Sequence, residues 1–220
     1  MPPDTPLILA FDTSAAHCAA ALVQGDSVLA HRNEPMLKGQ AERLMPMLEE
    51  IMSGADRRWS DLDSIAVGTG PGNFTGVRIS VAAARSLSLA LDIPAIGVSM
   101  FEALAYGTKG AAAILLDARR ERVFWQRFQD GVPASMPKQS DTEALTPTDF
   151  AKEAVLYGHQ ADVLANRMGF AFRPLADFQP QTLAFVAGGK KPDKRPAPIY
   201  LRPADAALPS DPPPLILDDA

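Results

Sequence analysis

The stretch that most limits the fold is GTGPGNFTG, Gly68 to Gly76, which holds four glycines and one proline in nine residues. It follows the apolar run Ile65–Gly68 and leads directly into the alanine-rich segment Val77–Leu91. A strand, a glycine-rich loop and a helix in this order place backbone N–H groups where they bind phosphate. The same residues fit a tight strand-to-helix turn equally well, with Asn73 or Thr75 as the helix cap.

Spacing argues against two common phosphate-binding loops. A P-loop requires a lysine directly after its last glycine, and no lysine occurs between Gly39 and Tyr106. A dinucleotide-binding loop has the spacing G-x-G-x-x-G and follows the first strand of its lobe. Here the spacing is G-x-G-x-x-x-G and the loop follows the fourth predicted strand, so this second interpretation is not favoured.

The order of the predicted elements around this loop is typical of a ribonuclease H-like lobe. Apolar runs and a Gly25-Asp26 turn predict three consecutive strands. The apolar spacing after them predicts a helix, a fourth strand, a second helix and a fifth strand, in that order. The strands are expected at Leu7–Phe11, Ala19–Val23, Ser27–His31, Ile65–Gly68 and Ala95–Ser99, and the helices at Gln40–Met52 and Val77–Leu91.

The second half of the chain begins like the first, which indicates a duplicated lobe. A shift of 105 residues places ILAFD on AILLD, Asp12 on Asp117, and the turn Gly25-Asp26 on Asp130-Gly131. We therefore predict an α/β protein with the duplicated ribonuclease H-like, actin-like ATPase fold and a degenerate second lobe. The predicted divisions are a first lobe at 1–105, a second at 106–202 and a proline-rich, disordered tail at 203–220. In the second lobe we expect a loop at 137–147, a strand at 155–158 and helices at 148–153, 162–168 and 181–187.

In the actin-like interpretation, acidic residues at the ends of the first strand of each lobe hold a metal-bound nucleotide phosphate between the lobes. Asp12 and Asp117 fit those two places, Thr13 adds a hydroxyl group, and Gly70 and Gly72 offer backbone N–H groups. These five residues are the predicted nucleotide-binding set, and an actin-like phosphotransferase or ATPase is one candidate function.

No convincing catalytic set or metal site accompanies that scaffold. The fourth predicted strand ends without an acid, and no histidine pair has metal-ligand spacing. His17 and Cys18 are adjacent on a predicted strand, so their side chains are expected on opposite faces. We predict no catalytic residue and no metal ligand, and a peptidase is the least favoured function.

Charge and composition limit the partners. The net charge is −5 and the pI about 5.2, which disfavours stand-alone nucleic-acid binding. The basic cluster Lys190, Lys191, Lys194 and Arg195 is interpreted as a solvated loop rather than a nucleic-acid contact. The single cysteine excludes an internal disulfide, and no signal peptide or membrane span is recognised, so a cytoplasmic protein is expected.

Two predicted helices look suited to a partner. Segment 36–52 holds four of the eight methionines, and the helix Val77–Leu91 has small residues nearly all round. Met45 and Met52 fall on the apolar stripe and Met47 off it. A monomer that covers the second helix with its own chain is the alternative. The predicted interface residues are Met45, Met47, Leu48, Met52, Val81, Ala83, Ala84 and Leu87.

Over about residues 7–206 the chain resembles the bacterial TsaB family, in the segments ILAFDTS, QAERLMPML, DLDSIAVGTGPGNFTGVRISVAAARSLSLALDIPAIGVSMFEALA, LLDARRERVFW and IYLRPADA. The resemblance implies a subunit of the machinery that makes N6-threonylcarbamoyladenosine at position 37 of tRNAs reading codons that begin with A. Older names for the family invoke a glycoprotease or M22 peptidase. Many members have His-Ser-Glu at the start of the first helix, where this chain has Gln40-Ala41-Glu42.

The resemblance also implies a role and partners. It implies a non-catalytic scaffold that pairs with the catalytic subunit TsaD through the two first-lobe helices, and that forms a homodimer through the same surface when alone. The ATPase TsaE joins the larger complex, and tRNA is contacted only indirectly. Asp12, Thr13, Gly70, Gly72 and Asp117 then mark a vestigial nucleotide site. ATP or ADP with Mg²⁺, bound weakly at the level of the complex, is the only cofactor left open.

Overall fold

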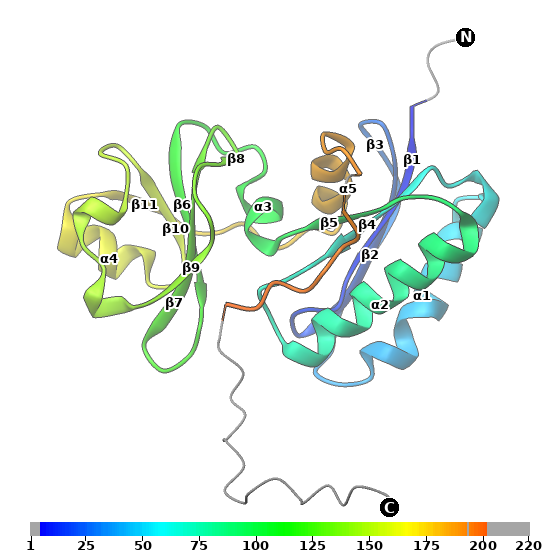
Figure 1. Cartoon of the computed structure of the whole chain (residues 1–220), viewed down its shortest axis with the longest axis horizontal. Coiled ribbons are helices and arrows are strands. Elements are labelled where there is room, and N and C mark those ends of the chain that lie inside the picture. The colour runs from blue at the N-terminus through cyan, green and yellow to red at the C-terminus, as the bar shows by residue number, and fades with distance from the viewer. Residues whose placement is uncertain (1–4, 193, 202–220) are drawn as a thin grey trace, which may run out of the picture.

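The chain folds into two lobes side by side, each built on one mixed β-sheet, in a computed structural model that describes residues 5–192 and 194–201 (Figure 1). The first sheet has the order β3-β2-β1-β4-β5. Its strands are β1 (Leu7–Asp12), β2 (His17–Gln24), β3 (Ser27–Pro35), β4 (Ser64–Gly68) and β5 (Ala95–Val98). The predicted order of strands and helices in this lobe is confirmed.

The central strand β1 places Asp12 next to the start of the glycine loop. All six of its residues are buried, because both faces of the first sheet are covered. It pairs antiparallel with β2 and parallel with β4, with Phe11 opposite Val67. The carboxyl end of β1, at Asp12, therefore lies next to Gly68, where the glycine loop begins.

Helices cover both faces of the first sheet. On one face lie α1 (Gln40–Gly54) and α2 (Phe74–Leu91), whose core includes Leu9 and Phe11. On the other face, Ile8 and Ala10 pack against α5 (Gln181–Gly188). The short helix α3 (Met100–Ala105) leads into the second lobe. The predicted second lobe, 106–202, thus contains a helix that returns to pack on the first sheet.

The exposed edge strand β3 is fastened to α1 by ion pairs. The Arg43 guanidinium contacts Glu34 at 2.7 Å and Glu50 at 2.8 Å. These contacts lower the pKa of both carboxyl groups and raise that of Arg43. Charged side chains along this edge also disfavour pairing with another strand.

The second sheet has the order β11-β10-β6-β7-β8, and β9 also pairs with β7. Helix α4 (Ala161–Met168) packs on one face of this sheet, and α3 packs on the other. The strands are β6 (Ala111–Asp117), β7 (Arg122–Gln129), β8 (Val132–Pro133), β9 (Lys138–Asp141), β10 (Val155–Gly158) and β11 (Ala171–Arg173). The predictions for β6, β10, α4 and α5 are confirmed.

Two predictions in the second lobe are wrong. Residues 138–141, expected in a loop, form β9, where Ser140 accepts a hydrogen bond from Trp125 Nε1 at 3.0 Å. The helix expected at 148–153 is only a 3₁₀ turn, Pro147–Asp149. The chain then extends and buries Phe150 beside Trp125, with ring centroids 5.4 Å apart. Tertiary packing overrides local propensity at both places. The tail predicted at 203–220 lies outside the described residues.

Among the described residues, α2 is the one helix long and apolar enough, by length and composition, to cross a membrane. Its Val77, Val81 and Ala84 are buried against the first sheet. Core helices of soluble proteins pass the same test, so the composition of α2 is weak evidence for a membrane span.

Candidate functional site

The carboxylate of Asp12 is buried at the end of β1 and is held by its own turn. Asp12 Oδ1 accepts hydrogen bonds from Ser14 N at 2.8 Å and Ser14 Oγ at 2.9 Å, and lies 2.7 Å from His17 Nε2. The His17 ring stacks on Phe178, with centroids 5.0 Å apart. Asp12, Thr13 and Ser14 are all 0% exposed. Asp12 Oδ2 has no hydrogen-bond partner among the described residues and faces Gly68.

The glycine loop packs directly onto this turn. Thr13 Oγ1 donates a hydrogen bond to Gly76 O at 2.7 Å, and Asn73 N donates to Ser14 O at 2.6 Å. A Cβ atom at Gly72 or Gly76 would overlap the carbonyl oxygen of Ser14 or Thr13. The glycines therefore permit a close backbone approach, and the chain itself occupies the space beside the Asp12 turn.

The start of α2 is capped by the chain. Asn73 Oδ1 accepts hydrogen bonds from Thr75 N at 3.0 Å and Gly76 N at 3.4 Å, which are two of the N–H groups a phosphate would need. The predicted cap role of Asn73 is confirmed. Gly70, at φ +82°, takes a conformation that favours glycine, and its carbonyl accepts a hydrogen bond from Met100 N at 2.8 Å. The nucleotide site at this loop stays a prediction, which the closed geometry does not favour.

Asp117 lies at the equivalent strand end of the second lobe, but its surroundings differ. Its side chain is 58% exposed, accepts a hydrogen bond from Arg119 N at 2.6 Å and lies 3.8 Å from His159 Nε2. The internal repeat thus matches the two positions in the fold, although one carboxylate is sealed and the other is open. In the described residues, no three His, Cys, Asp or Glu side chains gather as metal ligands do.

Cys18 and His17 point to opposite sides of the first sheet, as predicted. Cys18 is 0% exposed, and its Sγ lies 3.8 Å from Met47 Sδ in the core under α1. Burial raises the pKa of the thiol to about 11. A nucleophilic cysteine needs a lowered pKa and access to substrate, so this cysteine is unsuited to peptidase chemistry.

We predict that Cys18 reacts slowly with iodoacetamide in the folded protein. At pH 8 a thiol of pKa about 11 carries roughly 200-fold less thiolate than a free cysteine. Mass spectrometry is expected to find little labelling in buffer and complete labelling in urea. Rapid labelling of the folded chain would contradict this expectation and restore the peptidase alternative.

The structure divides the predicted interface residues into two groups. Met45 is 38% exposed, and Ala83 and Leu87 are partly exposed. The other five cannot contact a partner directly, because they are buried in the core of the first lobe: Met47, Leu48, Met52, Val81 and Ala84. The predicted places of two methionines on α1 were wrong, since Met47 lies on the buried stripe and Met45 off it.

The exposed side of α2 includes residues that the sequence reasoning missed. Leu89 is 83% exposed, and its exposed neighbours on the helix are Ala82, Ser86 and Ala90. The C-terminal half of α2 thus presents small side chains and one large apolar residue, Leu89, which lies beside the exposed Arg85 one turn away. We call this face, with Met45, Ala83 and Leu87, the α1–α2 surface. A period of 3.6 residues, counted from the buried Val77, Val81 and Ala84, marks these positions as exposed.

Comparisons with known proteins connect this chain to the proteins of tRNA threonylcarbamoyladenosine biosynthesis. The family model of TsaD, tRNA N6-adenosine threonylcarbamoyltransferase, matches residues 35–185. An uncharacterized protein of Mycobacterium tuberculosis is 33% identical over 204 residues, which cover 90% of this chain and 93% of that protein. The tRNA threonylcarbamoyladenosine biosynthesis protein TsaB of Escherichia coli is 37% identical over 127 residues, which cover 56% of this chain and 54% of that protein. The match thus spans about half the length of that curated TsaB relative.

Solved structures agree with both the family and the fold. YeaZ from Pseudomonas aeruginosa has a TM-score of 0.71 and 29% sequence identity, and the match covers 89% of this chain and all of that one. A component of (R)-2-hydroxyglutaryl-CoA dehydratase from Acidaminococcus fermentans, at 8% identity and a TM-score of 0.50, shares the fold alone. The predicted two-lobed, actin-like fold is confirmed. The fold and these relatives together place this chain in the TsaB family, which takes part in tRNA threonylcarbamoyladenosine biosynthesis.

Proposed function

We propose that this chain is a non-catalytic scaffold that pairs with a TsaD-type catalytic subunit through the α1–α2 surface. The observation that carries the proposal is the outer face of α2, where Leu89 is 83% exposed next to the small residues Ser86 and Ala90, with Arg85 beside it. Small side chains let a partner helix approach closely, and a large apolar residue supplies contact area. The closed turn at Asp12 supports a scaffold over an enzyme, because it leaves little room for a phosphate.

The α1–α2 surface is also the expected interface of the homodimer. A chain without its partner can cover this face with a second copy of itself, so the homodimer and the heterodimer are mutually exclusive. The ATPase TsaE joins the heterodimer in this proposal, and any ATP or ADP with Mg²⁺ belongs to the assembled complex. The ion pair between Arg43 and Glu34 links α1 to the edge strand β3 of the sheet.

The test mixes the purified chain with the TsaD protein of the same organism and measures molar mass by size-exclusion chromatography with light scattering. The wild type is expected to form a heterodimer. Leu89→Arg is expected to weaken it about 100-fold or more, because an unpaired guanidinium would be buried in a close interface. Met136→Arg is the matched control, since Met136 is 79% exposed and lies in the second lobe.

The outcome locates the interface. Loss of the complex in Leu89→Arg alone, with both variants folded, supports the α1–α2 surface. Equal complexes from both variants would place the interface elsewhere. Absence of any complex with the wild type would remove the scaffold proposal.

A further inference from the structure

The segment after α5 is fastened along the first lobe although it forms no helix or strand. We call residues 190–201, described except for 193, the C-terminal strap; it runs from the end of α5 past β5 and beside α2 (Figure 1). Lys190 Nζ donates to Gly97 O at 2.9 Å, Arg85 Nε to Pro196 O at 2.8 Å, and Ile199 N to Thr69 O at 2.9 Å. The strap is thus a positioned surface and not only a solvated loop.

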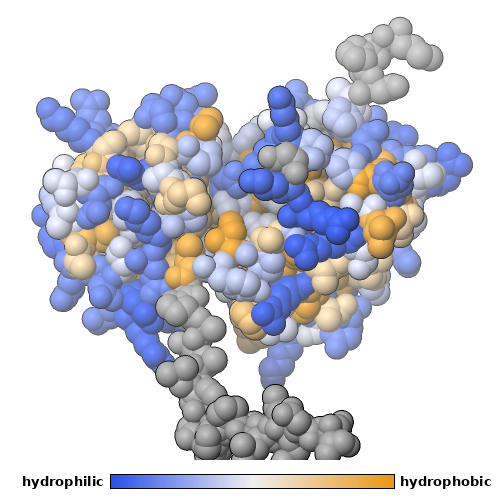
Figure 2. All heavy atoms as spheres, viewed as in Figure 1, coloured by the Kyte–Doolittle hydropathy of each residue, from blue (hydrophilic) through white to orange (hydrophobic). Residues whose placement is uncertain are grey.

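A basic groove lies where the strap crosses the first lobe. The groove has a volume of about 510 Å³, and its lining includes Thr69, Gly97 and the basic side chains of the strap. Lys190 is already paired with Glu102 at 2.7 Å. Lys191, Lys194 and Arg195 are exposed and form no ion pair within the described residues. Figure 2, in the same view as Figure 1, shows strongly hydrophilic residues gathered at the place where the strap leaves α5.

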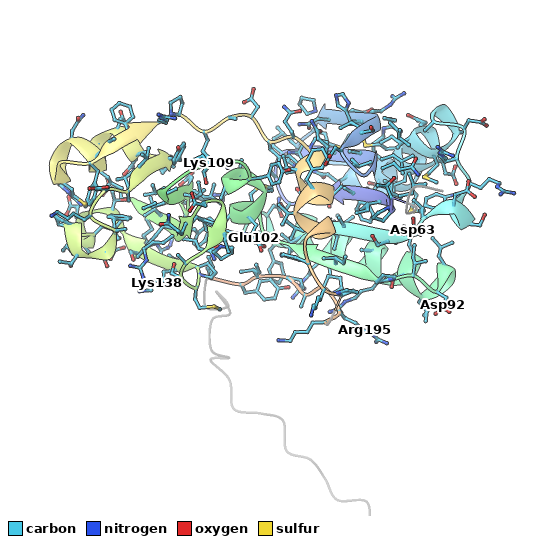
Figure 3. The ribbon with its side chains drawn as sticks, turned by 90° about the horizontal axis from the view of Figure 1, so that it is seen from above. Asp63, Asp92, Glu102, Lys109, Lys138 and Arg195 are labelled. Atoms are coloured by element: carbon cyan, nitrogen blue, oxygen red, sulfur yellow. The ribbon has the colours of Figure 1, made fainter. Side chains whose placement is uncertain are left out.

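These cations are unusual in an acidic chain. The sequence KKPDKR at 190–195 carries four basic residues and one acid, whereas the whole chain has a net charge of −5. Figure 3 labels Arg195 on the side of the strap where side chains project away from the ribbon. Like charges held together on a fixed segment create a local field that attracts a polyanion.

An aromatic platform follows on the same strap. The rings of Tyr200 and Phe74 lie 5.4 Å apart and are 51% and 55% exposed. The Arg78 guanidinium lies 3.7 Å from the Phe74 ring centroid, and Arg78 Nε donates to Tyr200 Oη at 2.9 Å. Exposed rings fixed by a guanidinium give flat faces on which a nucleobase can stack.

We propose that the C-terminal strap and this platform bind a single-stranded segment of RNA. Cations alone would also attract an acidic protein, but stacking faces beside a basic groove are what an unpaired strand requires. Arg195 and Tyr200 are five residues apart, a span of at most ~18 Å in extended chain, which a few nucleotides cover. The inference goes beyond the proposed scaffold role, which needs no RNA contact from this chain and was expected to involve tRNA only indirectly.

The test titrates the full chain into fluorescein-labelled single-stranded RNA of about 15 nucleotides and follows anisotropy from about 50 to 200 mM salt. Lys191→Gln/Lys194→Gln/Arg195→Gln is expected to weaken binding about tenfold or more and to lower the salt slope by about 2, at ~0.7 per phosphate contact. The matched triple control, Lys109→Gln/Lys152→Gln/Arg173→Gln, removes the same charge from exposed sites outside the strap. It is expected to change affinity by less than about twofold.

A second pair of variants tests the platform. Tyr200→Ala is expected to weaken binding about fivefold or more, as the loss of one stacked base does. Phe172→Ala is its control, because Phe172 is 48% exposed in the second lobe. Light scattering with the catalytic partner is run on the same proteins, and the strap variants are expected to keep the heterodimer. RNA binding and the proposed scaffold role can therefore fail separately.

Three results would overturn the inference. The first is a wild type that does not bind RNA at low salt. The second is an equal loss of RNA affinity in the triple variant of the strap and in its charge-matched control. The third is a wild type that binds polyglutamate as tightly as RNA, together with an unchanged RNA affinity in Tyr200→Ala. That last result would assign the groove to an acidic protein partner instead.

Discussion

Gly76→Ala is expected to destabilise the protein by about 3 kcal/mol or more, with a melting temperature lower by roughly 6–12 °C. The added Cβ would overlap the carbonyl oxygen of Thr13, which is backbone of a fully buried turn. That turn cannot move aside easily, because Thr13 Oγ1 is bonded to Gly76 O and Ser14 O to Asn73 N. Differential scanning calorimetry measures the effect.

Gly54→Ala is the matched control, because Gly54 is also helical and a Cβ there would meet nothing within 4 Å. Helix propensity alone predicts that both substitutions stabilise by up to ~1 kcal/mol. Packing predicts that Gly76→Ala lowers the free energy of unfolding whereas Gly54→Ala raises it. A Gly76→Ala protein as stable as Gly54→Ala would therefore contradict the close contact between the glycine loop and the Asp12 turn.

The strand order, the glycine turn and the internal repeat could be predicted because each depends on local residues. The all-apolar β1 and the Gly25-Asp26 turn define a hairpin, and a strand, loop and helix follow from residues 65–91. The repeat correctly placed Asp12 and Asp117 at equivalent strand ends. It did not indicate that one would be sealed, because burial depends on the loop that packs over it.

The surfaces were harder to predict than the strands. Apolar residues occur on more than one side of α1, so the sequence left the phase of the helix ambiguous, and Met45 and Met47 were exchanged. Helix α5 has no charged residue, and nothing local indicates which sheet it covers. The strap is fixed by contacts of Arg78 with Tyr200 and of Arg85 with Pro196, which are more than 100 residues apart in sequence.

Asp12→Ala is expected to destabilise the chain by about 3 kcal/mol, because it leaves several buried polar groups without their acceptor. Ser14 N, Ser14 Oγ and His17 Nε2 all lie within 2.9 Å of the same Asp12 oxygen. Asp117→Ala is the matched control from the equivalent strand end. Its carboxylate is 58% exposed and accepts one hydrogen bond, from Arg119 N, so we expect a loss below about 1 kcal/mol. Urea unfolding of the three proteins measures both effects.

The same proteins separate a scaffold from an actin-like phosphotransferase. A nucleotide that bound the native state at 100 times its dissociation constant would stabilise it by about 2.7 kcal/mol. We expect no such shift with ATP and Mg²⁺, because the loop at Gly72 and Gly76 already contacts the Asp12 turn and Asn73 caps α2. A shift in the wild type that both Asp12→Ala and Asp117→Ala abolish would mean that the loop opens to admit a phosphate. Asp12 would then be a ligand, and its role in holding the turn would be secondary. A large loss of stability in Asp12→Ala without any nucleotide effect would instead mean that the carboxylate serves the fold.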